Sequence, residues 1–366
     1  PSLQLLGPTG ATARYAAPYP SPKPNRDSRA LPPKIAAEIQ PPGPEPPSRQ
    51  STERGRQLDA MPLQEWIGAH VPGGGKSPLG LLLDIGFTTE YGAPLAEQSS
   101  LNMIYVLGDY TSQWPRIFDA YPSRYRVRGG NDLIAARLAE RLAGQIRLNH
   151  ALTAIERRDG GGYVLRFDGR PDFTADHAVL ALPFSILRRS VDLSRAGFSE
   201  RKMTAIRELG MGMNAKMHLQ FKTRHWLGLG STGETYADTG YQCTWDQSRA
   251  QKGPQGMLVN FLGADHALAL GERTPQLALA QLEPVLPGIT AQWNGLVRTD
   301  DWPRNPFTRG AYSFYRPGQY TLFGGAEGER EGNVHFCGEH TSRDWQGFMN
   351  GAVETGERAA REILGS

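Results

Sequence analysis

The C-terminal segment, residues 334–364, constrains the fold of this chain more than any other part of it. An apolar run at 334–337 stops at Gly338 and Glu339, and amphipathic spacing at 347–364 predicts a long helix. Gly338 allows a backbone to approach a ligand closely, and Glu339 can accept hydrogen bonds from hydroxyl groups such as those of a polyol. A buried strand, a glycine turn and a helix in this order are typical of an open α/β sheet that holds a cofactor at its strand ends.

Length and composition fit a globular protein of about two domains. The 366 residues are 39% hydrophobic and 21% charged, which is enough apolar material for a substantial core. Acidic residues are interleaved with 40 lysines and arginines, so the net charge is only +3 and no nucleic-acid-binding stripe is expected. No apolar run approaches the roughly 18–20 residues of a membrane span, which predicts a soluble protein, with the cytoplasm favoured. Cys243 and Cys337 show no metal-ligand spacing, so no metal site is expected.

Proline content separates the first 56 residues from the rest of the chain. They hold 13 of the 28 prolines, and regular structure is expected there only around 35–39. Both a flexible linker and an ordered excursion on a larger body fit this composition. Beyond them, apolar spacing predicts helices at 61–67, 78–91, 96–107, 133–142 and 347–364, and mostly helix at 187–209. Short apolar runs predict strands at 146–150, 152–157, 163–167, 177–182, 214–221 and 334–337, the second and third joined as a hairpin through 159–162.

Two glycine-rich segments match phosphate-binding patterns only in part. Residues 73–77 (GGGKS) would need a glycine at position 70, where the chain has His70, so a solvated turn is expected. Residues 228–233 spell GxGxxG, but turn formers follow them instead of a helical pattern, so a loop between two strands is expected. The sequence therefore shows no dinucleotide-binding fingerprint with its strand and helix.

The C-terminal segment resembles the flavin-containing monoamine oxidase family, which includes L-amino-acid and polyamine oxidases. The resemblance is carried by GEH at 338–340 and WQGFMNGA at 345–352, and it extends over residues 61–366. It implies that five residues of this segment bind FAD, namely Gly338, Glu339, Gly347, Phe348 and Met349. Glu339 would bind the ribityl or diphosphate part, and the Met349 amide would face the N1–C2=O edge of the flavin. A helix N-terminus suits that edge because reduction places negative charge there.

Three further matches concern the cofactor. Residues 128–130 (RGG) and the helix after them resemble the family's return from the substrate domain to the FAD domain. Leu152 falls on the strand that flanks the FAD adenine, and Trp302 falls at a cofactor-binding position. The residue before the cage tyrosine is Ala311, whereas the covalently flavinylated members carry cysteine there, which implies that FAD is bound non-covalently.

The resemblance also implies three catalytic residues. Lys216 matches the lysine that holds a water near flavin N5, where a cation would help to stabilise superoxide during reoxidation. Tyr312 and Phe348 match the two walls of an aromatic cage, which would exclude water and direct the amine and its α C–H toward the flavin. No Asp, Glu or His stands in the cage segments, so the amine is expected to bind neutral and to pass a hydride directly to N5 without a general base.

The expected fold is a mixed α/β fold with a Rossmann-like FAD-binding domain of the amine oxidase type, incomplete at its N-terminus, and an interleaved substrate domain. The expected boundaries are a proline-rich linker or excursion at 1–56, substrate domain at 57–123 and 209–309, and FAD-binding domain at 124–208 and 310–366. The strand–GxGxxG–helix unit that grips the FAD diphosphate is expected to be missing from this chain.

The implied function is oxidation of a primary amine or an L-amino acid, in which FAD takes a hydride, O2 yields H2O2, and the imine is hydrolysed. Two alternatives stay open: an inactive fragment or non-catalytic scaffold of an amine-oxidase-like protein, and a flavin amino-acid monooxygenase. The expected partners are the amine or amino acid and O2, with an N-terminal partner fragment or a second copy of the chain as candidates. An amino-acid substrate would need an arginine for its carboxylate, for which Arg124, Arg126 and Arg316 are candidates.

Overall fold

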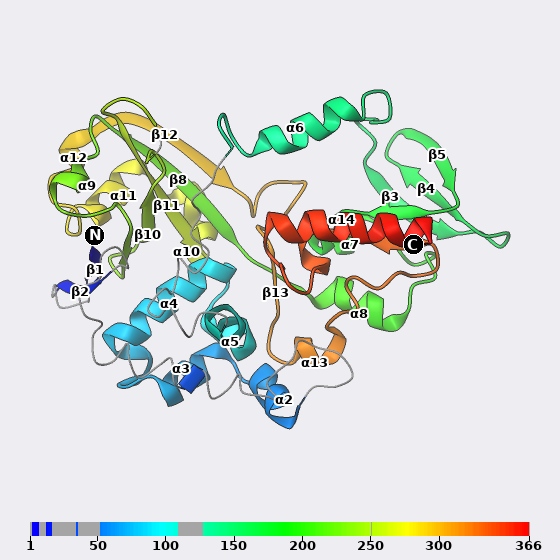
Figure 1. The fold of residues 1–366 in the computed structure, drawn as a ribbon, viewed down its shortest axis with the longest axis horizontal. Coiled ribbons are helices and arrows are strands. Elements are labelled where there is room, and N and C mark those ends of the chain that lie inside the picture. Colours follow the sequence, from blue (N-terminus) through cyan, green and yellow to red (C-terminus); the bar gives the residue numbers. More distant parts are fainter. Residues whose placement is uncertain are drawn as a thin grey trace.

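The computed structural model describes residues 2–6, 12–16, 34–35, 52–108, 127–249 and 251–365. Figure 1 shows two halves: a large sheet with helices on one side, and a second group of helices and small sheets around the long C-terminal helix. This mixed architecture is the α/β class that the sequence predicts. In the described residues, no helix is long and apolar enough to cross a membrane, and no group of three or more His, Cys, Asp or Glu side chains could hold a metal ion.

A seven-stranded sheet dominates the first half. Its strands, in spatial order, are β12 (Trp293–Asp301), β8 (Asn214–Phe221), β11 (Gly256–Gly263), β10 (Gln242–Asp246), β9 (Thr235–Ala237), β1 (Ser2–Leu6) and β2 (Thr12–Ala16). Neighbouring strands are antiparallel except for β1 and β9, which are parallel. In β8, predicted at its observed bounds, alternate residues from Ala215 to Phe221 are buried in one core, while Lys216, His218 and Gln220 are half-buried on the other face. The period of two therefore gives this sheet a core face and a face that carries Lys216.

Short helices cover the core face of this sheet. They are α9 (His225–Gly228), α10 (Asp265–Leu268), η3 (Ala269–Glu272), α11 (Pro275–Leu282) and α12 (Ile289–Gln292). Leu279 and Leu282 of α11 are buried in the same cluster as Leu219 and Phe221 of β8. The GxGxxG segment 228–233 lies between α9 and β9, so no helix follows it, as predicted.

The strand pair β1–β2 contradicts the expectation that the proline-rich region is without regular structure outside 35–39. Neither strand contains a proline, so every residue in them can donate to a ladder, and Pro8 lies between them. Gln4 pairs with Thr235, which adds the hairpin to the sheet edge. The prediction failed because it used the average proline content of 56 residues, which does not show that residues 2–6 and 12–16 contain no proline.

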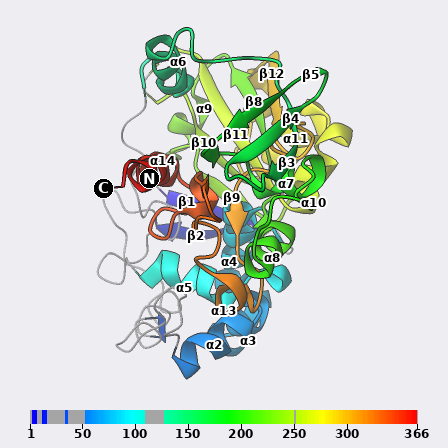
Figure 2. The same cartoon turned by 90° about the vertical axis from the view of Figure 1, so that its right-hand side faces the viewer.

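A layer of helices packs beside the Lys216 face, at the end of the molecule farthest from α6 in Figures 1 and 2. It contains α2 (Glu53–Ala60), α3 (Leu63–His70), η1 (Gly74–Lys76), α4 (Pro78–Tyr91), η2 (Leu95–Glu97) and α5 (Ser100–Gly108). The helix predicted at 78–91 has its observed bounds. The helix predicted at 61–67 is displaced, because Pro62 can only begin a helix and α2 ends at Ala60. GGGKS forms a turn in which Ser77 caps α4, with Gly80 N–H donating to its hydroxyl at 3.1 Å.

The second half surrounds α14 (Met349–Leu364), the helix predicted from residue 347. A three-stranded antiparallel sheet contains β3 (Leu152–Arg157), β4 (Tyr163–Phe167) and β5 (Arg170–Ala175), which confirms the predicted hairpin. The other elements are α6 (Asp132–Arg141), β6 (Ala178–Leu180), α7 (Phe184–Ser190), α8 (Glu200–Glu208), β7 (Gly210–Met211), β13 (Ser313–Phe314), α13 (Gln319–Phe323), β14 (Val334–Phe336) and η4 (Glu339–Thr341). β14 pairs in parallel with β6, and β13 pairs antiparallel with β7.

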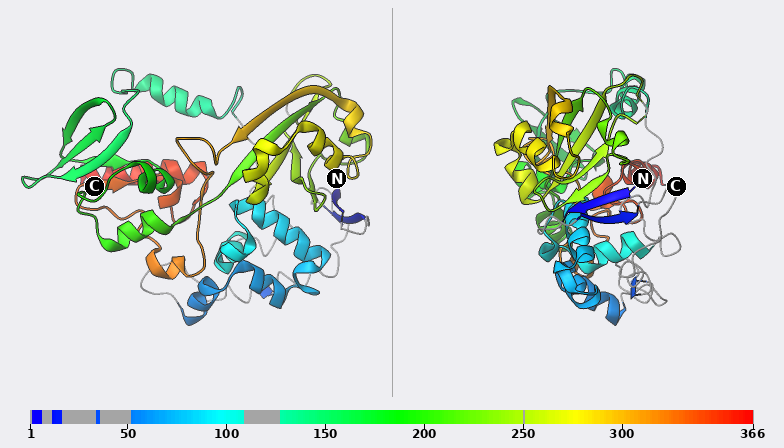
Figure 3. Two further views of the ribbon diagram at one scale, coloured as in Figure 1. Left: turned by 180° about the vertical axis from the view of Figure 1, so that it is seen from behind. Right: turned by 90° about the vertical axis from the view of Figure 1, so that its left-hand side faces the viewer.

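One prediction for this half is wrong. Residues 146–150 form no strand: Ile146 and Leu148 are exposed and pair with no other described strand. The prediction that 187–209 is mostly helix is confirmed, with a break between Ser190 and Glu200, where Ser199 caps a new helix by accepting from the Lys202 N–H. Helix α6, predicted within one residue, spans the space between the small sheet and the large sheet in Figure 3 and buries none of its residues. Its apolar residues Ile134 and Leu138 are 41% and 54% exposed.

Lys202 is the most deeply buried charged side chain of the second half, and Glu327 lies beside it. The Lys202 ammonium donates to the Glu327 carbonyl at 2.8 Å and lies 3.6 Å from the centroid of the Phe336 ring. The Glu327 carboxyl accepts from Tyr315 Oη at 2.8 Å. Burial lowers the pKa of Lys202 to about 7 and raises the pKa of Glu327 to about 7.

Lys202→Met should change how stability depends on pH. Above pH 7 the folded chain holds less of the Lys202 proton than the unfolded chain, so the free energy of unfolding should rise with pH, by at most about 1.4 kcal/mol per unit. Glu327 contributes almost no slope about one pH unit above its folded pKa of about 7, because its folded and unfolded forms are both almost fully ionised there. Urea unfolding between pH 7.5 and 9.5 should show the rise in the unchanged chain and in the exposed Lys222→Met, but not in Lys202→Met. An equal slope in all three would contradict the assignment.

Candidate active site

Glu339 joins three segments at the end of β14. Its Oε1 accepts from the Ser313 N–H at 3.0 Å, and its Oε2 accepts from Ser313 Oγ and from the Gly347 N–H, each at 2.8 Å. Burial raises the pKa of Glu339, and these hydrogen bonds oppose the rise. The carboxylate therefore fixes β13 and the loop before α14 relative to the end of β14.

The glycine before Glu339 is required by sterics. Gly338 has φ +122°, and a Cβ there would lie 2.7 Å from the ring of His340. Burial lowers the pKa of His340 to about 3, so this ring is neutral. Gly338 therefore keeps the turn tight against a buried neutral imidazole, at the place where sequence analysis predicts close approach of a ligand.

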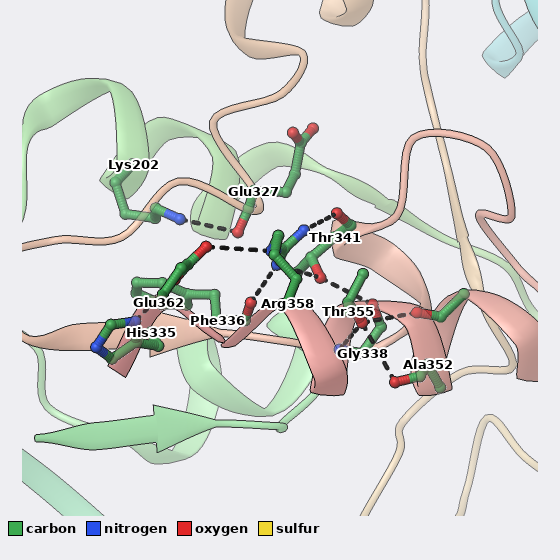
Figure 4. A network of polar contacts seen from close by, with 11 residues as sticks. Lys202, Glu327, His335, Phe336, Gly338, Thr341, Ala352, Thr355, Arg358 and Glu362 are labelled. Atoms are coloured by element: carbon green, nitrogen blue, oxygen red, sulfur yellow. Dashed lines mark hydrogen bonds and ion pairs between the residues drawn. The ribbon is translucent and has the colours of Figure 1, made fainter. Parts of the chain in front are cut away.

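A network of side chains on α14 holds this turn from behind (Figure 4). The Gly338 N–H donates to Thr355 Oγ1 at 3.0 Å. The Arg358 guanidinium donates to the carbonyls of Phe336 and Thr341 at 2.5 and 3.0 Å, and its Nε forms an ion pair with Glu362 at 3.3 Å. Strand, turn and helix are thus fixed together by charge-assisted hydrogen bonds.

The N-terminus of α14 offers hydrogen-bond donors beside Glu339. Phe348 occupies the cap position and makes no side-chain capping bond, and Gly347 before it has φ +84°. In the described part of the chain, the backbone N–H groups of Met349 and Asn350 have no acceptor. The positive end of a 16-residue helix with two unpaired N–H groups suits a ligand oxygen that carries negative charge.

Tyr312 lies at the same place. Its carbonyl accepts from the Gly212 N–H at 2.7 Å, and its hydroxyl donates to the Thr89 carbonyl of α4 at 3.4 Å. A Cβ built on Gly347 would lie 4.0 Å from the Tyr312 ring, so this ring lies next to the residue that precedes Phe348, whose side chain is 42% exposed. Burial raises the pKa of Tyr312, which keeps the phenol neutral. The structure therefore brings together Tyr312, Phe348 and the Glu339 turn.

Lys216 lies on the face of the large sheet opposite its core face. Its strand register places it opposite Phe261 and Asp300, and its ammonium lies 5.6 and 5.8 Å from the ring centroids of Phe261 and Trp245. Burial lowers the pKa of Lys216, and the charge of Asp300 opposes this effect. The lysine is a partly desolvated cation over aromatic rings, unlike the solvated edge residue that a lysine on a strand usually is.

The remaining predicted residues lie in other elements or outside the described residues. Leu152 lies in β3 of the separate three-stranded sheet (Figure 1). Trp302 follows β12 with 38% of its surface exposed, and its carbonyl accepts from the N–H of Gly310, two residues before Tyr312. Arg316 is 3.7 Å from Glu97, and its guanidinium stands over the Phe314 ring. Arg124 and Arg126 lie outside the described residues.

Sequence analysis missed Glu90, an acidic residue in the last turn of α4. The helix was predicted, but its direction relative to Tyr312 was not, and the absence of Asp, Glu and His was noted only for the cage segments, which do not include α4. The charge of Glu90, after burial itself, raises the pKa of Tyr312. The sequence feature that could have drawn attention to Glu90 is its place as the single acid in the otherwise neutral run TTEYG, at the end of an apolar helix.

Comparison with known proteins gives relatives over most of the chain. The flavin containing amine oxidoreductase family matches residues 54–364. A putative L-amino-acid oxidase, YobN, of Bacillus subtilis is 29% identical over 68% of this chain and 54% of its own length. Amine oxidase [flavin-containing] A of Equus caballus is 26% identical over 64% of this chain and 46% of its own length. An L-amino acid dehydrogenase of Synechocystis is 24% identical over 86% of this chain and 66% of its own length. The chain thus spans about half the length of the first two.

Solved structures share the fold. A putrescine oxidase bound to putrescine superposes with a TM-score of 0.82 at 21% identity, covering 100% of this chain and 81% of the other. Cyclohexylamine oxidase from Brevibacterium oxydans superposes with a TM-score of 0.80 at 20% identity, covering 99% and 80%. These similarities confirm the α/β fold of the amine oxidase type. Together with the match over residues 54–364, they show that the chain belongs to the flavin-containing amine oxidoreductase family, whose cofactor is FAD.

Proposed function

We propose that this chain provides the catalytic site of a flavin-dependent oxidase of primary amines or amino acids. One observation carries the proposal: Tyr312 lies against Gly347, beside Phe348 and next to the uncapped N-terminus of α14. Two aromatic side chains beside a cluster of cofactor-type donors form an apolar, oriented site of the kind that a neutral amine requires. Relatives named as amine oxidases and L-amino-acid oxidases support the same reaction class.

The donor set of the site fits FAD. The N–H groups of Met349 and Asn350 would hold the pyrimidine oxygen of the flavin, and the Gly338–Glu339 turn would hold the ribityl or diphosphate part. Because Ala311 precedes Tyr312, attachment is non-covalent. When bound, FAD supplies a two-electron acceptor for the hydride of the substrate Cα–H, and O2 takes those electrons on as H2O2.

The residues of this chain orient the substrate and control water. Tyr312 and Phe348 place apolar faces beside the amine and exclude water, which favours the neutral amine over the ammonium. In the reaction, the amine nitrogen of the substrate loses a proton and its Cα loses a hydride. The resulting imine is hydrolysed by water to a carbonyl compound and ammonia. Lys216 supplies positive charge to the oxygen half-reaction, where negative charge develops on O2.

We also propose the domain boundaries expected from the sequence. Residues 57–123 and 209–309 form the substrate domain, and residues 124–208 and 310–366 form the FAD-binding domain. The exposed apolar residues Met349 and Val353 of α14 and Ile134 and Leu138 of α6 then mark the surface where a strand and helix bearing a diphosphate loop would pack. That unit could be supplied by the same protein or by a bound fragment.

An absorption spectrum tests the proposed function. The purified protein with added FAD should show protein-bound flavin bands, and an amine or amino acid added without O2 should bleach them, because the substrate passes two electrons to the cofactor. Readmitted air should restore the bands with formation of H2O2. Bound flavin that no amine or amino acid reduces would refute oxidase activity, and absence of bound flavin would refute a complete cofactor site.

Glu339→Gln should weaken flavin binding. The carboxylate accepts three hydrogen bonds on two oxygens, and an amide can accept on only one of these atoms, so the loop before α14 loses an anchor. We expect the dissociation constant for FAD to rise by about tenfold, because this is the change in binding free energy that the loss of one charged hydrogen bond typically causes. Flavin fluorescence quenching measures it, with exposed Glu357→Gln on α14 as the control. Equal affinities in both variants would contradict this role.

Lys216→Met should slow reoxidation and leave flavin reduction by substrate nearly unchanged. Removing the partly desolvated cation costs stabilisation of the negative oxygen species, by about 10- to 100-fold in rate. Stopped-flow mixing with substrate and then with O2 separates the two half-reactions. Lys222→Met, an exposed lysine at the far end of the same strand, is the control. If reduction slowed instead, Lys216 would act on the substrate.

A further inference from the structure

The Asp300 carboxylate lies opposite Lys216 but is held by a different side chain. In the register of β8 and β12, Asp300 is the direct partner of Lys216. Side chains at such positions have Cβ atoms about 5 Å apart, which is close enough for an ion pair. Nevertheless, no ion pair joins Lys216 and Asp300 in the described part of the chain. The Asp300 carboxylate lies 2.9 Å from Nε2 of His218 instead.

The surroundings of His218 direct its imidazole toward β12. His218 lies two residues after Lys216 on β8, so the two side chains share one face of the sheet. Its partner on the other neighbouring strand is Val259, which is buried and has no polar side-chain atom. A carboxylate can only accept, so His218 Nε2 donates to Asp300. The His218 side chain is only 18% exposed, so little water competes for this bond.

Lys216 consequently has aromatic neighbours and no acidic contact. Its ammonium lies 5.6 and 5.8 Å from the ring centroids of Phe261 and Trp245, and no hydrogen-bond acceptor contacts it among the described residues. Burial lowers the pKa of Lys216, and the charge of Asp300 opposes this effect. Asp300 therefore acts on Lys216 through space, and the N–H donors of the ammonium remain available to another group.

Other ionisable groups lie on the elements around Lys216 but do not take the place of Asp300. They are Arg298 of β12, Cys243 and Tyr236 in the row beyond Phe261, and Asp84 and Glu90 of α4, which packs against β10 and β11. The arginine is exposed. Burial raises the pKa values of all the others, which keeps the thiol and the phenol uncharged and disfavours charge on the two carboxyl groups. Asp300 is the charged group that opposes the lowered pKa of Lys216.

We propose that His218 is a positioning residue for Lys216. By holding the Asp300 carboxylate, it keeps this charge close enough to favour the ammonium form of Lys216 and far enough away to prevent an ion pair. Lys216 then stays both charged and free to contact a negatively charged oxygen species. This inference rests on the proposed oxidase function, in which Lys216 supplies positive charge to the reaction with O2.

Either extreme of the distance between Asp300 and Lys216 would impair this function. In a direct ion pair, the ammonium would use N–H donors on the carboxylate, and the adjacent negative charge would cancel much of its field. Without the carboxylate, the buried lysine would lose its proton more easily, because burial disfavours the charged form. A carboxylate that is opposite Lys216 but bonded to His218 avoids both.

An NMR titration of the 366-residue chain tests the inference without flavin. Lysine carrying carbon-13 at Cε reports the protonation of each lysine, and the Lys216 resonance is the one lost in Lys216→Met. In Asp300→Asn the midpoint of the Lys216 titration should move to lower pH, because the opposing charge is lost. In His218→Leu it should move to higher pH, because the released carboxylate pairs with the ammonium across the strands. A general loss of structure would not give shifts of opposite sign.

Three further variants identify the interaction. His218→Gln keeps an N–H donor for Asp300 and should titrate like the unchanged chain. The double variant His218→Leu/Asp300→Asn should titrate like Asp300→Asn alone, because the two residues act through one contact. Asp301→Asn removes the next carboxylate of β12, which faces the other side and pairs with Arg304, and should leave the midpoint in place. A midpoint in His218→Leu that stays or falls would overturn the inference, as would His218→Gln behaving like His218→Leu.

Stopped-flow reoxidation of the FAD-loaded protein separates this inference from the proposed function. His218→Leu should slow the reaction with O2 by about three- to tenfold, because the ammonium is then paired, and should leave reduction by substrate nearly unchanged. If the NMR midpoints shift as expected but the rate with O2 does not change, only the oxygen role of Lys216 fails. If the midpoints do not shift, the positioning role of His218 is refuted at any rate of reoxidation.

Discussion

The hydrogen bonds of the Glu339 carboxylate are the constraint on which the candidate site depends. They join β13, the turn after β14 and the loop before α14, through partners that lie 26 residues before and 8 residues after Glu339. Tyr312 immediately precedes the Ser313 that Glu339 holds, and Phe348 immediately follows the held Gly347. One carboxylate therefore sets the distance between the two aromatic side chains and the start of α14. Such a position needs an acceptor with two oxygens, which neither a hydroxyl nor an amide provides.

The side of the turn opposite the cage is rigid for a different reason. Arg358 satisfies carbonyls at the ends of β14 and η4, and Lys202 packs on the Phe336 ring, so charged side chains fill space that apolar residues fill elsewhere. Buried charges of this kind add little net stability but are costly to misplace, which specifies one arrangement of the strand end. The Gly338–Glu339 turn thus has hydrogen bonds on both sides and little freedom to move.

Local patterns predicted much of this fold. Local pattern located α4 and β8 at their observed bounds, because β8 alternates buried and half-buried residues and α4 is a largely buried apolar run between the Ser77 cap and Gly92. It failed where tertiary context decides: Ile146 and Leu148 have a strand-like pattern but no partner strand, and Ser2–Leu6 forms a strand through pairing with distant β9. The cage residues came from family resemblance at specific positions, since an isolated tyrosine or lysine carries no such signal.

Glu90 shows why a site is harder to predict than the elements that build it. Its helix was evident from the sequence, but the meaning of its charge depends on what faces the helix end. That is set by the register of β9, β10 and β11 and by the bond between Tyr312 and Thr89. If a cationic side chain lay opposite Glu90, the two would form an ordinary structural ion pair. Without one among the described residues, burial raises the pKa of Glu90 at the negative end of α4.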